Sequence, residues 1–272
     1  MQPSSAANRK INRVMLLLVM FFVSMLVHPL LFTTVATSSL KLDYNPVELR
    51  VITYNIRHAE GLDGKVRPEA VAAELRPLHA DVIALQEVDR YKWRSGLHDQ
   101  ARYFARELGM NYVFAPSIRS GLSQYGIALL SRYPLESPRQ YRLSGGREPR
   151  SLLTAELHLS GRKITVATTH LGVAAAERQQ QLPQLQYILK GVPEPLLLMG
   201  DFNSISPGMP KLGLIRLKFP EVTSTVLKGG EIDHIFVSSD LAYEAPVATV
   251  PSRASDHLPV VASLVMKPAR EP

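Results

Sequence analysis

The chain of 272 residues carries a formal net charge of +7 and contains no cysteine. Without cysteine there is no disulfide, no thiolate nucleophile and no zinc site built on sulfur, so oxygen or imidazole ligands would hold any metal. Arg9, Lys10 and Arg13 supply three of the positive charges, and the +4 left for the rest of the chain is too mild to indicate a concentrated basic stripe for duplex DNA.

The N-terminal region is predicted to insert into a membrane. Residues 14–32 are almost wholly apolar and follow the three basic residues, and a bilayer is crossed by roughly 20 such residues. Basic residues on that side favour a cytoplasmic N-terminus. We expect residues 1–13 to be a cytoplasmic basic region and residues 14–36 to be an uncleaved transmembrane anchor. A cleaved signal peptide is the alternative, because Thr34-Val35-Ala36 loosely resembles a signal-peptidase site.

The rest of the chain alternates strand-like and helix-like stretches. Residues 37–48 are expected to be a linker, residues 49–267 one domain and residues 268–272 a tail, since single domains often exceed 200 residues. Predicted helices lie near 67–78, 98–108 and 175–190, and predicted strands near 49–55, 82–87, 111–115, 126–131, 150–158, 164–170, 196–201, 232–237 and 258–266. The alternation predicts an α/β fold.

Polar residues of chemical use end several of these predicted strands. Asn55 ends the first strand, Glu87 the second, and His170 the strand over 164–170. Asp201 and Asn203 follow a buried apolar run, and side chains two apart on an extended chain share a face. Ligands in open α/β sheets collect beyond the strand ends, so we expect these side chains to converge.

The C-terminal third adds further candidates. Asp233 lies inside a predicted strand, and Asp256 and His257 precede the last strand. His234 must face away from Asp233 if the strand is regular, so we interpret it as structural.

Seven short motifs, in order along the chain, resemble those of the endonuclease/exonuclease/phosphatase superfamily. The match runs from about residue 49 to 265 and rests on Thr53-Tyr54-Asn55, Leu85-Gln86-Glu87-Val88, Ser131-Arg132-Tyr133-Pro134, Thr169-His170-Leu171, Gly200-Asp201-Phe202-Asn203, Ile232-Asp233-His234-Ile235 and Ser255-Asp256-His257-Leu258-Pro259-Val260. The resemblance implies a DNase I-like four-layer α/β sandwich, with two mixed β-sheets face to face and helices outside. It also implies one Mg²⁺-dependent phosphoesterase site at the top of the sheets, in the domain over 49–267.

The metal residues follow from this resemblance and from ligand chemistry, whereas the substrate residues follow from a dense basic stretch of the sequence and from a position just ahead of a predicted strand. Glu87 is the leading Mg²⁺ ligand, because a lone carboxylate at a strand end suits a hard cation that keeps its waters. Asn55 and Asp256 are expected to complete the metal site, with Mn²⁺ as a substitute metal. Arg150 and Tyr125 are the candidates for substrate binding. Without the resemblance, Glu87 would equally well form a strand-end salt bridge.

The catalytic roles are implied by the same resemblance. Asp201 would orient or deprotonate the attacking water, and Asn203 would hold the transition state. His257, with Asp233 fixing its tautomer, would supply a second proton-transfer group. His170 stands where nuclease and sphingomyelinase-like members carry a phosphate-binding or acid histidine.

The function predicted from these residues is Mg²⁺-dependent hydrolysis of a phosphodiester by direct water attack, at the exterior of the membrane. We expect the chain to span the cell membrane once, or to be secreted after signal cleavage, and to need no obligate protein partner. A phospholipid or another cell-surface phosphodiester is favoured. A surface-tethered or secreted DNase or RNase, a phosphomonoesterase and a non-catalytic binding module remain alternatives. Exposed apolar side chains beside the site would favour lipid, and a basic groove would favour nucleic acid.

Overall fold

The computed structural model describes residues 48–159, 162–209, 212–243 and 247–266. All belong to Thr34–Pro272, the larger of the two units into which the chain divides. The predicted cytoplasmic region, membrane segment and tail, and nearly all of the predicted linker, lie outside these ranges. Within them, no helix is long and apolar enough to span a membrane.

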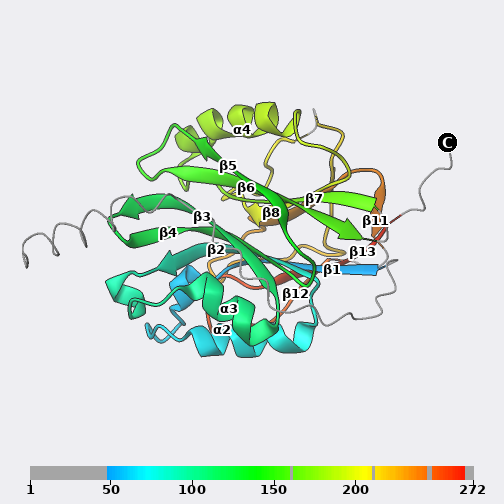
Figure 1. The fold of residues 1–272 in the computed structure, drawn as a ribbon. Coiled ribbons are helices and arrows are strands. Elements are labelled where there is room, and N and C mark those ends of the chain that lie inside the picture. Colours follow the sequence, from blue (N-terminus) through cyan, green and yellow to red (C-terminus); the bar gives the residue numbers. More distant parts are fainter. Residues whose placement is uncertain (1–47, 160–161, 210–211, 244–246, 267–272) are drawn as a thin grey trace, which may run out of the picture. The chain divides into compact units, whose positions relative to one another are not determined.

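Two mixed β-sheets lie at the centre of the described fold (Figure 1). The first has the order β11 (Leu241–Tyr243), β13 (Val260–Met266), β1 (Glu48–Asn55), β2 (Val82–Arg90), β4 (Ser123–Ser131) and β3 (Asn111–Ser120), with β12 (Ala248–Thr249) also paired to β13. The second has the order β5 (Glu136–Leu143), β6 (Arg150–Leu159), β7 (Arg162–His170), β8 (Leu196–Asp201), β10 (Asp233–Val237) and β9 (Ile215–Arg216). The pairs β1–β2 and β7–β8 are parallel, and their neighbours are antiparallel.

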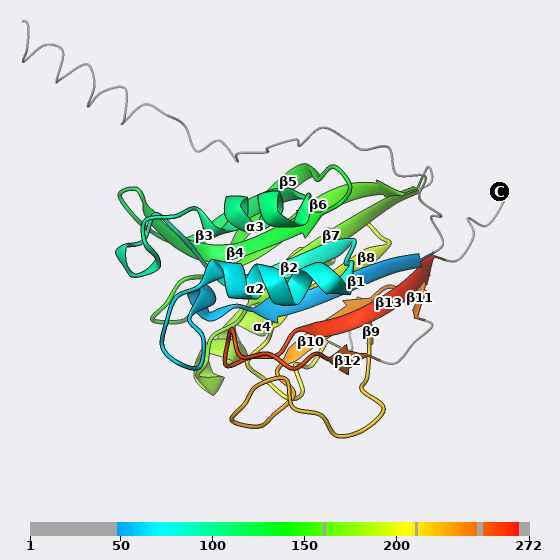
Figure 2. The ribbon, with the colours of Figure 1, turned by 90° about the horizontal axis from the view of Figure 1, so that it is seen from below.

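Helices cover the outer face of each sheet (Figures 1 and 2). The helices α2 (Pro68–Leu75) and α3 (Gln100–Leu108) lie on the first sheet and α4 (Ala175–Leu189) on the second, with short 3-10 turns at η1 (Arg57–Ala59), η2 (Arg76–Leu78) and η3 (Trp93–Ser95). Local chemistry bounds α3: the Asp99 carboxylate accepts the Arg102 amide at 3.1 Å, and Gly109 ends the helix in the left-handed region.

Three apolar cores separate the four layers. Val51 and Leu197 belong to the core between the sheets, which we call the inter-sheet core. Tyr54 and Phe104 belong to the core beneath α2 and α3, and a third core lies beneath α4. The predicted four-layer α/β sandwich is therefore confirmed.

Some elements differ from the sequence prediction. The strand β5 was not predicted, because its charged and polar residues lack an apolar alternation, as is common on an edge strand. The strands β9, β11 and β12 are too short to carry a pattern. The α-helical part of 67–78 stops at Leu75, and η2 completes the stretch where Pro77 lacks an amide N–H.

Candidate active site

Strand alternation brings four predicted side chains to one end of the inter-sheet core. Each of them shares a strand face with a residue of that core two or four positions away: Asn55 with Val51, His170 with Val166, Asp201 with Met199, and Asp233 with Ile235. Asp201 is the register partner of both His170 and Asp233. These four side chains are buried, so the convergence expected from the strand ends is present.

Asp201 lies at the centre of the group. Its Oδ2 accepts the Asn55 side-chain amide at 3.0 Å, and its Oδ1 accepts the Asn203 backbone amide at 2.8 Å. Gly200 allows the backbones of β7 and β8 to lie close together at this point. A Cβ at residue 200 would lie 2.1 Å from the Thr169 carbonyl oxygen, and the φ of Gly200 is +153°. The carboxylate is thus held by two donors on a closely packed strand.

Asp233 and His257 form a hydrogen-bonded dyad. The Nδ1 of His257 lies 2.9 Å from Asp233 Oδ2, which also accepts the Thr225 hydroxyl at 2.7 Å. The other ring nitrogen lies 3.8 Å from Asp201 Oδ2. Burial opposes a charge on this imidazole, but the charge and hydrogen bond of Asp233, together with the charge of Asp201, raise the pKa of His257 to about 9. His257 is therefore protonated near neutral pH and aimed at Asp201.

The pKa of Asp201 is also raised. Burial, and then the nearby charge of Asp233, raise the pKa of Asp201 to about 7, against the opposing effects of His257 and the two amide donors. A carboxyl with such a pKa can hold or accept a proton near neutrality, which is the property of a general base.

His170 is paired with Arg150. One guanidinium nitrogen of Arg150 lies 3.0 Å from His170 Nδ1 and 2.7 Å from Glu148 Oε1. The His170 Nε2 lies 3.5 Å from Asp201 Oδ2. Burial, followed by the positive charges of Arg150 and His257, lowers the pKa of His170 well below its usual value. His170 is thus a neutral imidazole, and the same nitrogen of the buried Arg150 also lies 3.3 Å from its Nε2.

Glu87 reaches the site through an irregularity in β2. The register between β2 and β4 shifts between Leu85 and Val88, and Glu87 itself has a φ of +58°. Its half-buried carboxylate accepts the Asn55 amide at 3.1 Å, so one carboxamide joins Glu87 to Asp201. The Asn55 oxygen accepts the Arg57 backbone amide at 3.0 Å.

The loop 252–257 is tied to the site through Ser255. Its hydroxyl donates to the Asn55 carbonyl at 2.8 Å and accepts the His257 backbone amide at 3.2 Å. Asp256 is half-buried, and its carboxylate lies 3.4 Å from the Ser255 hydroxyl. Ser255 and Thr225 are contributors that the sequence analysis did not single out. Ser255 stood in a quoted motif, whereas Thr225 lies in an irregular loop without any signal.

The remaining predicted residues have clear positions. The expectation that Asp201 and Asn203 share a face of an extended chain is wrong, because β8 ends at Asp201 and Asn203 has a φ of +49°. The Asn203 side-chain amide instead donates to the Leu171 carbonyl oxygen at 2.9 Å, which joins the loop after β8 to the residue that follows β7. The ring of Tyr125 is buried, with Arg94 at 5.4 Å and Lys92 at 6.0 Å from its centroid. Burial, followed by the charge of Glu87, raises the pKa of its hydroxyl. His234 faces the other side of β10, as expected, and its Nε2 lies 2.7 Å from the Ser204 carbonyl oxygen.

The donor set fits a divalent cation. One ligand atom from each of Asp201, Asp233 and His257 lies within 4.8 Å of the other two, and the Asp233 Oδ1 is buried with no hydrogen-bond partner among the described residues. The protonated His257, which is hydrogen-bonded to Asp233, has no lone pair for a metal, so the candidate donors are the carboxylate oxygens of Asp201 and Asp233 and the more open carboxylate of Glu87. Oxygen donors that crowd negative charge in this way suit Mg²⁺ or Mn²⁺.

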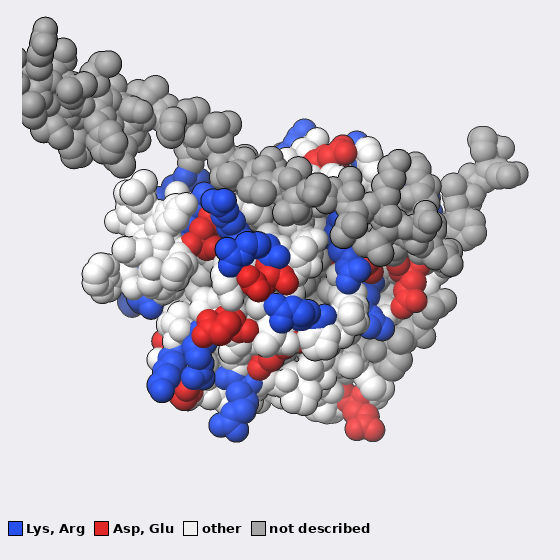
Figure 3. Space-filling view, turned by 60° about the horizontal axis from the view of Figure 1, so that its bottom comes forward, with Lys and Arg blue, Asp and Glu red and all other residues white. Residues whose placement is uncertain are grey.

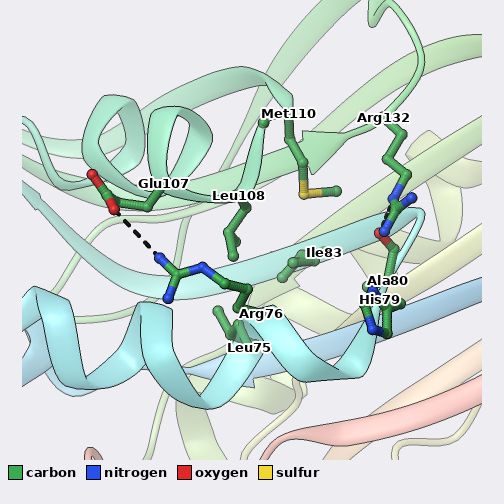
Figure 4. Close-up of a pocket in the computed structure, with 10 residues that line it drawn as sticks. Leu75, Arg76, His79, Ala80, Ile83, Glu107, Leu108, Met110 and Arg132 are labelled. Atoms are coloured by element: carbon green, nitrogen blue, oxygen red, sulfur yellow. Dashed lines mark hydrogen bonds and ion pairs between the residues drawn. The ribbon is translucent and has the colours of Figure 1, made fainter. Parts of the chain in front are cut away.

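A separate hollow of about 370 Å³ lies at the opposite end of β2, between α2 and α3 (Figure 4). Its floor is apolar, with Leu75, Ile83 and Met110, and Arg76 pairs with Glu107 at its rim. It contains none of the predicted site residues, so the end of the inter-sheet core remains the candidate site.

Comparison with known proteins agrees with this architecture. The model of the Endonuclease/Exonuclease/phosphatase family matches residues 52–257. The protein YbhP of Escherichia coli (strain K12) is 32% identical over 141 residues, which are 47% of this chain and 56% of YbhP. The chain thus spans about half the length of the curated relatives it matches.

Solved structures show the same fold. An endonuclease/exonuclease/phosphatase from Beutenbergia cavernae superposes with a TM-score of 0.66 at 23% identity, covering 81% of this chain and 72% of that one. The mannosyl-6-phosphatase Bt3783 of Bacteroides thetaiotaomicron superposes with a TM-score of 0.64 at 20% identity, covering 80% and 100%. At these identities the likeness concerns the fold.

Proposed function

Since the chain belongs to the endonuclease/exonuclease/phosphatase family, whose members are metal-dependent phosphoric ester hydrolases, we propose that it hydrolyses a phosphodiester by direct attack of water. The observation that carries this proposal is the geometry of Asp201 and His257: two amides hold the buried carboxylate, and a ring nitrogen of His257 lies 3.8 Å from it while Asp233 binds the other ring nitrogen. A base whose pKa is about 7 beside an acid whose pKa is about 9 suits proton transfer to and from oxygen.

We propose that Glu87 is the principal metal ligand, with Asn55 and Asp256 beside it. The open carboxylate of Glu87 and the crowded negative charge of Asp201 and Asp233 support this assignment. A bound Mg²⁺, or Mn²⁺ in its place, would withdraw charge from the phosphoryl oxygens and so favour attack on an anionic ester.

In the proposed reaction Asp201 orients the attacking water and accepts its proton. The amides of Asn55 and Asn203 fix this carboxylate at 3.0 and 2.8 Å, so little reorganisation is needed when the water is deprotonated. His257, held by Asp233, then donates a proton to the leaving oxygen or stabilises its charge. No side chain needs to form a covalent intermediate.

The neutral His170 and its Arg150 partner are proposed to face the phosphoryl group. A neutral imidazole next to Asp201 donates one hydrogen bond to an oxygen without competing for the proton of the water. Arg150 favours this neutral form, and we assign it a positioning role at His170. Asn203 is proposed to hold the transition state from the loop after β8.

The cellular placement remains a proposal that rests on residues 14–36 alone. The apolar segment there, which lies outside the described residues, supports a single-pass anchor with the domain outside the cytoplasm. A phosphodiester at the membrane exterior would then be the substrate.

The test is hydrolysis of bis(p-nitrophenyl) phosphate and p-nitrophenyl phosphate by the full chain in non-ionic detergent with Mg²⁺. We expect the diester to be the better substrate, and Asp201→Asn and His257→Ala each to lower kcat by about 10²-fold or more. His158→Ala, an exposed histidine on β6, is the matched control and should retain full activity. Preference for the monoester would move the assignment to a phosphatase, and full activity in Asp201→Asn would refute the mechanism.

A further inference from the structure

The only tryptophan of the chain, Trp93, is 86% exposed and lies in the loop that follows β2. Large aromatic side chains are usually at least half covered in a folded domain. The same strand carries Glu87, six residues earlier, so this loop begins at the edge of the candidate active site. A tryptophan that is so exposed is unusual at this position.

The loop that carries Trp93 contacts the β3–β4 hairpin near its tip. Arg90 pairs with Gln124 across the sheet, and the side chains of Lys92 and Arg94 lie over the ring of Tyr125. The two loops lie side by side at one end of the first sheet in both views (Figures 1 and 2). The hairpin tip presents Leu122, which is 68% exposed.

Other loops at the same end also expose apolar side chains. We call this set the apolar rim: Leu62, Trp93, Leu97, Leu122, Val173 and Ile205. Leu62 comes after β1, Val173 after β7 and Ile205 after β8, and these strands end in Asn55, His170 and Asp201. Single exposed apolar residues are ordinary on a protein surface, but here they are gathered in the loops around one site.

Positive charge accompanies the rim. Arg119, beside the hairpin tip, is exposed. Lys92 adjoins Trp93 in the chain. In Figure 3 a mostly uncharged surface is bordered by lysine and arginine, with acidic side chains among them. Apolar side chains bordered by cations are complementary to an anionic bilayer surface.

Single-stranded nucleic acid fits this surface less well. Stacking on bases requires aromatic platforms along a basic groove, whereas Leu97, Leu122 and Val173 are aliphatic. Elsewhere on the face shown in Figure 3, acidic side chains are interspersed with the basic ones. No basic track is evident on that face among the described residues.

We infer that the apolar rim inserts into the headgroup region of an anionic phospholipid bilayer and brings the active site onto the phosphodiester of a lipid headgroup. The inference rests on the proposed phosphodiesterase function and names its substrate class. Tryptophan suits the bilayer interface because its ring is apolar and its N–H is polar.

The unique Trp93 supplies a direct test with the full chain. The protein is incorporated into vesicles of phosphatidylcholine and phosphatidylglycerol that contain bromine-labelled acyl chains, and quenching of tryptophan fluorescence is measured. We expect clear quenching of Trp93, and its loss by severalfold in Leu97→Asp and Leu122→Asp, because a buried charge opposes insertion. Tyr187→Asp, at a 79% exposed position on α4, is the matched control and should leave the quenching unchanged.

A membrane anchor elsewhere in the chain cannot imitate this result, since only Trp93 reports. Absence of quenching in the unchanged protein would overturn the inference. Equal quenching in Leu122→Asp would do the same. Quenching of Trp93 by an oligonucleotide, without any by brominated lipid, would identify nucleic acid as the occupant instead.

A second measurement separates this inference from the proposed function. The rate on phosphatidylglycerol vesicles is divided by the rate on the soluble diester, and Leu122→Asp should lower that ratio about tenfold or more. Hydrolysis of the soluble diester without Trp93 quenching would support the proposed phosphodiesterase function and refute membrane insertion of the apolar rim. Trp93 quenching without hydrolysis of any diester would keep the rim as a membrane-binding surface and refute the phosphodiesterase.

Discussion

At the scale of the residue, Asp201 combines a catalytic property with a cost in stability. Its folded-state pKa of about 7 lies above the ordinary value of 3.8, so the folded state binds the proton more tightly than the unfolded state. The stability contributed by this protonation is present below about pH 3.8 and is lost as the pH rises through about 7. Above that pH the buried charge destabilises the fold.

Asp201→Asn removes the buried charge but also replaces one of the two oxygens that accept N–H donors, so its effect on stability has two parts. Only the part that comes from the charge depends on pH, so without metal the Tm of Asp201→Asn relative to the unchanged protein should rise as the pH rises through about 7. Each kcal/mol gained raises the Tm by about 2–4 °C in a domain of this size, which differential scanning calorimetry resolves. A Tm difference that does not vary between about pH 5 and pH 8 would contradict a raised pKa of Asp201 in the folded state.

The dyad of His257 and Asp233 has the opposite dependence on pH. The pKa of His257 is raised from 6.5 to about 9, so its stabilising effect is complete below about pH 6.5 and disappears as the pH rises through about 9. We expect the Tm difference between the unchanged protein and His257→Gln to be largest near the acid end of this window and to shrink toward the alkaline end. A difference that does not vary with pH would exclude a charged His257.

At the scale of the element, the close contact of β7 with β8 sets the position of Asp201. Gly200→Ala should destabilise the protein by about 1–3 kcal/mol or more. The new Cβ would clash with the Thr169 carbonyl oxygen, and the φ of Gly200 is one that residues with a side chain rarely adopt. Chemical denaturation measures this loss.

Gly191→Ala is the matched control for that substitution. Its Cβ would meet only the Ile188 carbonyl oxygen, at an ordinary 3.6 Å. A cost within about 0.5 kcal/mol is expected there. Equal effects at the two glycines would contradict the proposed role of the β7–β8 contact.

The elements also show why much of this site could be predicted from sequence. Strand alternation is a local property, so Asn55, Asp201 and Asp233 could be assigned to one face before any contact was known. The same rule correctly predicted that His234 lies on the opposite face of β10 from Asp233. The bulge that aims Glu87 depends on pairing with β4, which no local pattern encodes.

At the scale of the whole molecule, the order of layers was predictable and the loops were not. The three cores follow from apolar periodicity along long strands and helices. The hydroxyl of Thr225, which donates to Asp233, and the exposure of Trp93 depend on irregular segments whose conformation has no repeating signal. Residues 14–36 lie outside the described ranges, and their insertion in a membrane stays a prediction.

The measurement that tests the central claim most directly is the initial rate of bis(p-nitrophenyl) phosphate hydrolysis by the full chain, with Mg²⁺ and after EDTA, in the unchanged protein and in Glu87→Gln. We predict turnover that EDTA abolishes and Mg²⁺ restores, with a higher Mg²⁺ requirement in Glu87→Gln because one charged ligand is lost. Turnover that is indifferent to EDTA, or a Glu87→Gln protein with the same Mg²⁺ dependence as the unchanged one, would contradict a metal-dependent phosphodiesterase centred on these residues.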